Sequence, residues 1–359
     1  MKIVVIGGGV AGLSIGWRLA QAGEEVTVLE RASPGQGATA ASAGMLAVTA
    51  EHLDATQAER DFAFRSKGLW PGFAQEVETV SGRAIGYKEV GALILAEDAI
   101  GLDRLWRQAA GARDTELVNA ARVREIAPLA TGAIAGGLWS KEEAIVNNRA
   151  LGWALASVFQ KAGGNLKINE AAVRIERKEG RAAVAHTPFG LHHADLFVLA
   201  AGAWSGLLEK DMAPIIPVKG EMIWLAPPPT QTPPNFVIWG HGVYAVPRDG
   251  GLMIGATVEE AGFDTATTEK ARQALLSAAT GLMPSLRNWR IEDQWAGLRP
   301  RAPDGLPLLG PSAVEGLWLA SGQYRNGILF APALAEALSQ QILGKAPGIA
   351  AFDPKRFAS

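Results

Sequence analysis

The apolar positions at the start of the chain predict a strand, a helix and a second strand in close succession. A continuous apolar run over residues 3–6 enters a glycine-rich turn, and apolar residues at helical spacing follow over residues 13–19. Gly23 ends this helix, and residues 25–30 read as the second strand. This order is typical of the first unit of a parallel α/β sheet.

Helical periods recur later in the chain. They predict helices over residues 58–80, around 102–106, over 146–163 and 267–283, and at the C-terminus. Pro71 predicts a kink or a restart in the first of these helices, and Pro332 is expected in the first turn of the last. Trp153 is expected on the apolar side of the 146–163 helix.

Strand patterns fill much of the remaining chain. They lie at residues 87–96, around 173 and 184, at 222–225, 236–239, 243–246 and 252–257, and twice in the tail. Residues 195–204 form a continuous apolar run that ends in small residues. Such a run predicts a buried central parallel strand whose carboxyl end approaches a ligand closely.

These patterns predict an α/β fold with two domains, and 359 residues are enough for both. We expect a discontinuous Rossmann-like nucleotide-binding domain made of residues 1–84, 145–213 and 295–359. Residues 85–144 and 214–294 are expected to form a substrate-binding domain around a mixed or antiparallel β-sheet.

The turn after the first strand carries Gly7, Gly9 and Gly12 in the spacing G-x-G-x-x-G. The first glycine permits the tight turn, the second lets the backbone approach a pyrophosphate, and the third lets the helix pack closely. The helix N-terminus offers free N–H groups to phosphates. Glu30, at the end of the second strand, is placed to accept hydrogen bonds from a ribose, so we predict a dinucleotide site.

The next segment favours FAD among the dinucleotides. Arg31 follows the acid directly and, taken alone, leaves NADP open. Residues 34–49 are mostly small and uncharged, which lets the backbone lie against a large flat ligand. An NAD enzyme would normally continue with another strand–helix unit at this point.

Composition and charge narrow the function classes. Lys and Arg number 34 against 36 Asp and Glu, and the net charge of −2 argues against nucleic-acid or anionic-lipid partners. With no cysteine, the chain has no disulfide, iron–sulfur cluster or flavin tethered through sulfur. The five histidines show no metal-ligand spacing, and the longest apolar stretch, residues 196–208, is too short to span a membrane. We expect a soluble cytoplasmic protein without a metal site.

Two later residues have the chemistry of an amino-acid site. Arg299 lies in an otherwise apolar strand, and a guanidinium is the best partner for a substrate carboxylate. Strand alternation is expected to place Tyr244 opposite Val243 and Val246, where its hydroxyl can reach the same carboxylate. A surface arginine and a packing tyrosine are the plainer alternatives.

The motifs around these residues carry a resemblance. Gly-Met-Leu at 44–46, Val-Tyr-Ala-Val-Pro-Arg at 243–248, Gly-Leu-Arg-Pro at 297–300 and Tyr-Arg-Asn-Gly-Ile-Leu at 324–329 occur in this order. Nearly end to end, the chain resembles the glycine oxidases of the D-amino-acid oxidase superfamily, flavoenzymes that serve thiamine biosynthesis in many bacteria. The resemblance implies a homotetramer or a homodimer.

The resemblance also implies the site residues. Arg299, Tyr244, Arg325 and Met45 are expected to line the substrate site. The residues expected to hold non-covalent FAD are Gly7, Gly9, Val10, Ala11, Gly12, Glu30, Arg31, Thr39, Ala40, Ser42, Ala43, Gly44, Met45, Val173, Ala201, Gly202, Trp204, Arg299, Gly322, Tyr324, Arg325, Asn326, Gly327 and Ile328. The N-terminus of the last helix is expected to face the flavin.

The expected reaction is oxidative deamination of glycine or a small D- or N-methyl amino acid. The hydride passes from Cα to flavin N5, the imine hydrolyses, and O2 is reduced to H2O2. No general base is evident in the sequence. Gly242 and Val258 occupy positions where relatives can carry larger pocket residues, so the choice between glycine, sarcosine, D-amino acids and cyclic imino acids stays open.

Three other interpretations remain at this point. A D-amino-acid or D-proline dehydrogenase would pass its electrons to a quinone instead of O2. A flavin-dependent tRNA-modifying enzyme is disfavoured by the charge of −2. A flavoprotein without turnover is disfavoured by Arg299 and Tyr244.

Overall fold

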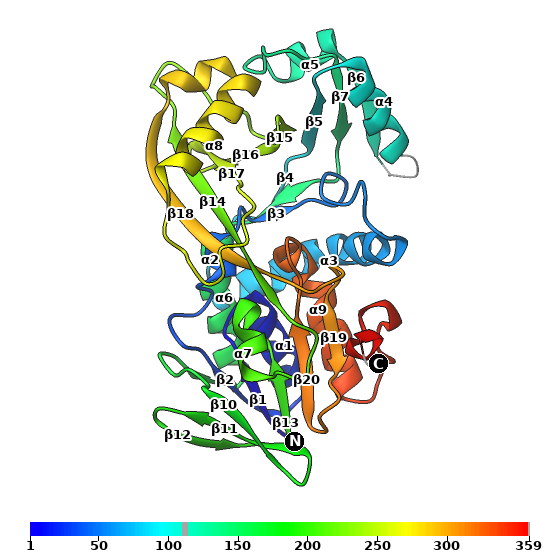
Figure 1. Cartoon of the computed structure of the whole chain (residues 1–359), viewed down its shortest axis with the longest axis vertical. Helices are drawn as coiled ribbons and strands as arrows, with labels where there is room; N and C mark the ends of the chain where they lie inside the picture. The colour runs from blue at the N-terminus through cyan, green and yellow to red at the C-terminus, as the bar shows by residue number, and fades with distance from the viewer. Residues whose placement is uncertain (110–113, 358–359) are drawn as a thin grey trace.

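The computed structural model describes residues 1–109 and 114–357, and its main parts are two lobes stacked along the long axis (Figure 1). The lower lobe in that view is built on a six-stranded sheet of the order β19-β20-β13-β1-β2-β9. Its strands are β1 (Lys2–Ile6), β2 (Glu25–Leu29), β9 (Asn165–Lys167), β13 (Leu196–Leu199), β19 (Leu308–Pro311) and β20 (Leu317–Ser321). All neighbours are parallel except β19 and β20, so the predicted central parallel strand is confirmed as β13.

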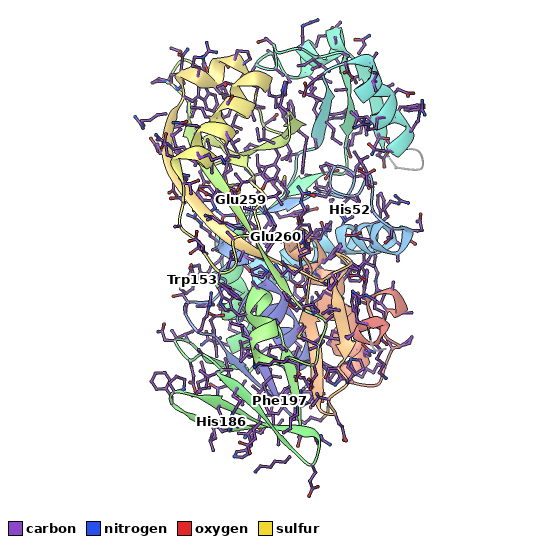
Figure 2. All side chains as sticks on the ribbon, in the orientation of Figure 1. His52, Trp153, His186, Phe197, Glu259 and Glu260 are labelled. Atoms are coloured by element: carbon purple, nitrogen blue, oxygen red, sulfur yellow. The ribbon has the colours of Figure 1, made fainter. Side chains whose placement is uncertain are left out.

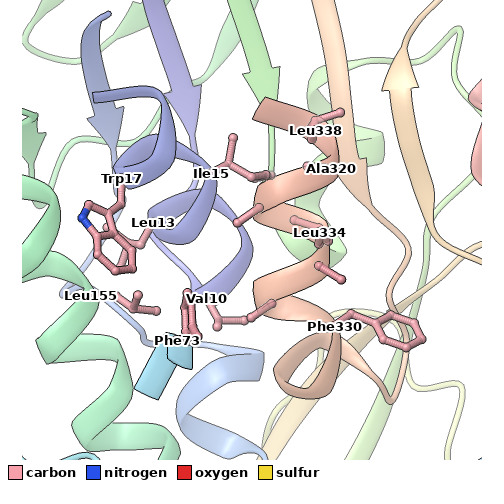
Figure 3. Close-up of a cluster of buried hydrophobic side chains, with 14 of the residues drawn as sticks. Val10, Leu13, Ile15, Trp17, Phe73, Leu155, Ala320, Phe330, Leu334 and Leu338 are labelled. Carbon is pink, nitrogen blue, oxygen red and sulfur yellow. The ribbon is translucent and has the colours of Figure 1, made fainter. Parts of the chain in front are cut away.

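Both faces of this sheet are covered, which explains its near-continuous apolar strands. Alternate residues of β1 face opposite sides: Ile3 and Val5 pack against helices, whereas Val4 and Ile6 face a second, three-stranded sheet. The helices are α1 (Val10–Gln21), α3 (Gln57–Ser81), α6 (Asn148–Lys161) and α9 (Gly327–Ile342). The small sheet is β10 (Arg174–Lys178), β11 (Arg181–Thr187) and β12 (Gly190–His193). Figure 3 shows Val10, Leu13, Phe73 and Leu155 meeting between these helices.

The upper lobe is an eight-stranded sheet of the order β18-β14-β17-β16-β15-β5-β7-β6. Its strands are β5 (Ala92–Ala96), β6 (Thr115–Asn119), β7 (Gly136–Ser140), β14 (Ile216–Ala226), β15 (Val237–Gly240), β16 (Val243–Arg248), β17 (Gly251–Gly255) and β18 (Arg290–Arg301). Its pairings are antiparallel except between β5 and β15, so the expected mixed sheet is confirmed. The helices of this lobe are α4 (Ala99–Gln108), α5 (Ala120–Ile126) and α8 (Glu269–Leu282).

Small elements complete the junction between the lobes. They are β3 (Met45–Leu46), β4 (Lys88–Glu89) and β8 (Ala144–Ile145), with the short helices α2 (Ala38–Ala41) and α7 (Ser205–Leu208). The long strand β18 pairs with β14 from Arg290 to Arg301 and so runs across residue 295, where the sequence placed a domain limit. Of the helices within the described residues, none has the length and apolar character that a membrane span requires.

The two prolines within helices behave differently from the expectation. Helix α3 continues through Pro71, so the expected restart does not occur. Pro71 lies on the exposed face of the helix, where water can reach the carbonyl that loses its partner. Pro332 lies in the second turn of α9, not the first. Helix α3 compensates: Ser66 Oγ and Trp70 Nε1 donate to the Leu329 carbonyl at 2.6 and 2.9 Å, and the Ala333 amide donates to Ser66 Oγ.

The expectation for Trp153 is wrong. Its side chain is 49% exposed, and Figure 2 shows it at the outer edge of the molecule. Trp153 is two residues from both Leu151 and Leu155, which are buried, and a step of two residues reaches the far side of a helix.

Candidate active site

A cavity of about 520 Å³ lies at the junction of the lobes, a size typical of cofactor sites. Its walls come from the glycine turn, the segment after β13, the start of α9, and strands β14, β16 and β18. Segments that are far apart in the sequence thus meet around one space.

At one end of the cavity, the glycine turn leads into α1. Gly7 has φ +113°, and a Cβ there would lie 2.4 Å from the Ala200 carbonyl oxygen. A Cβ on Gly12 would lie 1.9 Å from the Gly7 carbonyl oxygen, so the third glycine lets the helix close on the turn. The N-cap Gly9 provides no side-chain cap, and the Val10 amide donates to Thr39 Oγ1 at 3.0 Å, so the other N–H groups of the first turn of α1 are left for an anion.

Glu30 binds the backbone of the same turn. Its carboxylate accepts hydrogen bonds from the Gly8 and Ala32 amides at 2.7 and 2.8 Å, and it lines the cavity. A carboxylate has about four lone-pair sites, so these two bonds leave capacity for a ribose. The Arg31 guanidinium lies 3.4 Å from the centroid of the Trp204 ring, and both residues line the cavity wall.

The N-terminus of α9 faces the cavity from another side. Gly327 and Ile328 line it, and the N-cap Asn326 makes no side-chain cap. The Asn326 side chain instead donates from Nδ2 to Glu59 Oε1 at 3.1 Å. Two uncapped helix N-termini therefore direct their partial positive charge at one cavity.

The small-residue loop before β3 is held in place by a partly buried arginine. The Arg248 guanidinium donates to the carbonyls of Ala43 and Val146 at 3.0 and 2.8 Å and to Asn148 Oδ1 at 3.1 Å. Burial lowers the pKa of Arg248 to about 10. This arginine of the 243–248 motif thus holds the loop that brings Met45 to the cavity.

At the opposite end, Arg299 and Tyr244 line the cavity. Arg299 Nη1 donates to the Thr257 and Lys219 carbonyl oxygens at 3.1 and 3.4 Å. Burial raises the pKa of Tyr244, so its hydroxyl stays protonated and able to donate. On β16, Tyr244 lies on the same face of the strand as Val246 and on the opposite face from Val243 and Ala245. The expectation that Tyr244 faces away from Val243 is therefore correct, and the expectation that it faces away from Val246 is wrong.

Two glycines make room for these side chains. A Cβ on Gly220 would lie 2.3–2.5 Å from the Arg299 guanidinium, and a Cβ on Gly255 would lie 2.6 Å from the Tyr244 ring. Strands β14 and β17 therefore position the two functional side chains by carrying none of their own at these points.

Glu51 is a cavity residue that the sequence analysis missed. Its Oε2 lies 3.0 Å from Nε of Arg325, and its side chain is only 10% exposed. Burial raises the pKa of Glu51, against the opposing effect of Arg325 and Arg299. Glu51 follows a stretch of small and polar residues with no motif, so no local signal marks it.

The loop that carries Glu51, residues 47–52, is held by two buried groups. The Glu143 carboxylate accepts from the Val48, Thr49 and Ala50 amides at 2.9, 2.7 and 3.2 Å. His52 Nδ1 lies 3.1 Å from the Ala47 carbonyl oxygen. Burial raises the pKa of Glu143 to about 7 and lowers that of His52 to about 4.

Comparison with known proteins identifies the family. Residues 2–341 match the family described as FAD dependent oxidoreductase, DAO. The chain belongs to this family. The crystal structure of glycine oxidase from Geobacillus kaustophilus superposes with a TM-score of 0.93 at 30% identity, covering 99% of this chain and 98% of that one.

Curated relatives agree in sequence. The glycine oxidase of Pseudomonas aeruginosa is 33% identical over 367 residues, covering 99% of this chain and 98% of the relative. The bifunctional protein ThiO/ThiG of Trichormus variabilis is 36% identical over 95% of this chain. The chain spans about half, 52%, of that longer relative.

The cavity of this FAD-dependent family member fits its cofactor. Gln323 is 6% exposed and lines the wall, and its Nε2 has no hydrogen-bond partner among the described residues, so it is a donor that a bound ligand can satisfy. The glycine turn at one end suits a pyrophosphate. Within residues 1–109 and 114–357, no group of three or more His, Cys, Asp or Glu side chains could hold a metal ion.

Most residues expected at the site line the cavity. Those that do are Gly7, Gly9, Val10, Ala11, Glu30, Arg31, Thr39, Ser42, Ala43, Gly44, Met45, Val173, Ala201, Gly202, Trp204, Tyr244, Arg299, Tyr324, Arg325, Asn326, Gly327 and Ile328. Gly12, Ala40 and Gly322 are not part of its wall. Gly12 packs against the turn, Ala40 accepts from Asn148 Nδ2 at 3.0 Å, and Gly322 with φ +76° lies against Ala302. Neither Gly242 nor Val258 lines the cavity, and Val258 is exposed.

Proposed function

We propose that this protein oxidatively deaminates glycine or another small amino acid, including N-methyl and D-amino acids. The observation that carries the proposal is the placement of Arg299 and Tyr244 at one end of a cavity whose other end is the glycine turn. A carboxylate-binding pair and a dinucleotide-binding turn in one space fit the oxidation of an amino acid by a flavin.

The chain's own residues bind and orient the substrate. Arg299 offers a planar fork of donors to the carboxylate, and the protonated Tyr244 hydroxyl offers one more. The anchored carboxylate fixes the position of the Cα–H bond, which supplies the proximity that such a reaction needs. FAD, when bound, supplies the hydride acceptor at N5. Met45 and Met222 line the wall near this end, which favours a small substrate side chain.

The relatives support the same reaction. Proteins named glycine oxidase are 33% identical over nearly the full chain, and one relative is named for ThiO, so a role in thiamine biosynthesis is part of the proposal. On the same ground we propose O2 as electron acceptor, a cytoplasmic location and a homodimer or homotetramer. We also propose that residues 1–84, 145–213 and 295–359 bind FAD non-covalently and that residues 85–144 and 214–294 bind the substrate.

The first experiment follows the visible spectrum of the purified protein. Anaerobic addition of glycine, sarcosine, D-alanine or D-proline should bleach the flavin bands with at least one of them. Restoring air should then return the colour and yield peroxide. Bleaching that persists in air but is reversed by a quinone would assign the dehydrogenase alternative instead.

Replacing Arg299 tests the anchor directly. We expect Arg299→Ala to raise KM for the preferred amino acid by roughly 10- to 100-fold, because a charge-assisted hydrogen bond contributes about 1.5–3 kcal/mol. The KM of Arg299→Lys should lie between those of the wild type and Arg299→Ala, since an ammonium keeps the charge but cannot form the bidentate contact. Unchanged steady-state constants in Arg299→Ala would contradict the role.

A further inference from the structure

The substrate end of the cavity carries three charged side chains. Glu51, Arg299 and Arg325 all line it, whereas the charged lining residues Glu30 and Arg31 belong to the glycine-turn end. Two cations and one anion sum to a single positive charge.

The two cations are not equivalent. Arg325 is paired with Glu51, whose Oε2 lies 3.0 Å from Nε, and burial of the Glu51 side chain strengthens this attraction. Arg299 Nη1 donates to the backbone carbonyls of Lys219 and Thr257, which are dipoles and carry no net charge. A ligand entering the cavity therefore meets one cation held by backbone carbonyls and one cation in an ion pair with Glu51, which attracts Arg299 less strongly than Arg325.

The Glu51 carboxylate is also held in place. The loop of residues 47–52 is fixed by three hydrogen bonds from its backbone amides to the Glu143 carboxylate and by the contact of His52 with the Ala47 carbonyl oxygen. A ligand that needed Arg325 would have to displace Glu51 against these contacts and leave a carboxylate unpaired in a buried position, which is costly.

We propose that the Glu51–Arg325 pair selects the charge of the ligand: the site binds molecules with one carboxylate at Arg299 and rejects molecules with two. A second carboxylate, as in iminodiacetate, finds its cation already occupied and approaches the fixed negative charge of Glu51. This inference rests on the proposed function only in that the ligand carboxylate binds at Arg299.

The test compares acetate with malonate, which carry one and two carboxylates. Their dissociation constants are measured on the FAD-loaded enzyme from changes in the flavin absorbance. We expect Glu51→Gln, which keeps the size and removes the charge, to tighten malonate relative to acetate by at least about tenfold. Glu51→Asp keeps the charge and should retain the wild-type preference.

A matched control removes a carboxylate elsewhere at the junction. Glu260 pairs with Arg301 on an exposed segment, and Figure 2 shows it in the middle of the molecule, where the lobes meet. Because solvent screens it, Glu260→Gln should leave the malonate-to-acetate ratio unchanged. An equal gain in this variant, or an equal shift of both ligands in Glu51→Gln, would overturn the proposal.

Reciprocal variants keep the proposal testable if Glu51→Gln fails to load FAD. Arg325→Gln leaves Glu51 unpaired and should weaken malonate more than acetate. In the double variant Glu51→Gln/Arg325→Gln, the net charge of residues 51, 299 and 325 is again +1, as in the wild type. The ratio of malonate to acetate affinity should therefore return towards the wild-type value. A double variant that keeps the altered ratio of either single variant would refute the charge balance.

Turnover separates this inference from the proposed function. If the enzyme oxidises sarcosine, Glu51→Gln should raise kcat/KM for iminodiacetate relative to sarcosine by about tenfold or more. If no amino acid is oxidised, the proposed function fails, yet the binding ratio of acetate and malonate still decides the role of Glu51.

Discussion

At the scale of single residues, Gly220 and Gly255 leave the space that Arg299 and Tyr244 fill. Neither glycine has a positive φ, so backbone conformation does not require them. What requires them is the close approach of a neighbouring side chain, 2.3 Å at Gly220 and 2.6 Å at Gly255. Specificity for the substrate thus depends partly on residues that never touch it.

Gly220→Ala tests this dependence. The added methyl group would displace the Arg299 guanidinium, and we expect the dissociation constant of acetate to rise roughly tenfold or more. Gly68→Ala is the matched control: Gly68 is an exposed helical glycine with nothing within 4 Å of its Cβ. It should leave binding unchanged and stabilise α3 by about 0.5–1 kcal/mol. Equal acetate affinity in both variants would refute the steric argument.

At the scale of elements, the loop of residues 47–52 is fastened to the segment between β7 and β8, which carries Glu143. Glu143 and His52 hold it, and their pKa values are shifted in opposite directions by the same burial. A folded-state pKa of about 7 means that native Glu143 binds a proton that the unfolded chain, with a pKa of 4.5, releases. Its contribution to stability is therefore complete below pH 4.5 and lost as the pH rises to about 7.

For His52 the sign is reversed. Its folded-state pKa of about 4 lies below the unfolded value of 6.5, so its contribution is complete above pH 6.5 and lost as the pH falls to about 4. Each of these two differences in pKa corresponds to roughly 3 kcal/mol. The two effects occupy nearly the same pH range and oppose one another.

Glu143→Gln removes the opposing contribution of Glu143, so the pH dependence of stability that His52 causes should become measurable. We expect the free energy of unfolding of this variant to rise between pH 5 and 7 by about 2–3 kcal/mol more than that of the wild type. Urea unfolding at several pH values, with FAD in constant excess, measures the difference. His52→Asn should show the opposite slope, and parallel curves for the three proteins would contradict the assignment.

At the scale of the whole molecule, the cavity wall combines both lobes, so a ligand that fills it also joins them. Binding to the folded state alone stabilises it by about 4 kcal/mol when the ligand is at 1,000 times its Kd. The glycine turn and Glu30 are expected to hold the pyrophosphate and the adenosine ribose, which FMN lacks.

FAD should therefore raise the thermal midpoint in a concentration-dependent way, and FMN should raise it much less. Differential scanning fluorimetry of the cofactor-free protein with each flavin measures both shifts. Equal stabilisation by FAD and FMN would show that the glycine turn contributes nothing to cofactor binding.

Much of this arrangement could be predicted from local sequence. The turn at Gly7, the central strand β13 and the placement of Arg299 at the cavity all depend on patterns within about ten residues. Glu51 could not be found in this way, because its partner Arg325 is supplied by the fold, 274 residues later in the chain. Likewise, Pro332 is accommodated in the second turn of α9 by Ser66 and Trp70 of another helix.

The order of strands in the lower sheet has a consequence for how the chain matures. Strand β1 is synthesised well before its neighbour β13, which starts at Leu196, and before the next strand, β20, which starts at Leu317. Synthesis of the intervening residues takes on the order of tens of seconds, during which β1 has its partner β2 but lacks β13, and α1 lacks α9. The cavity wall that holds the prosthetic group can thus be completed only after the start of α9 has been synthesised.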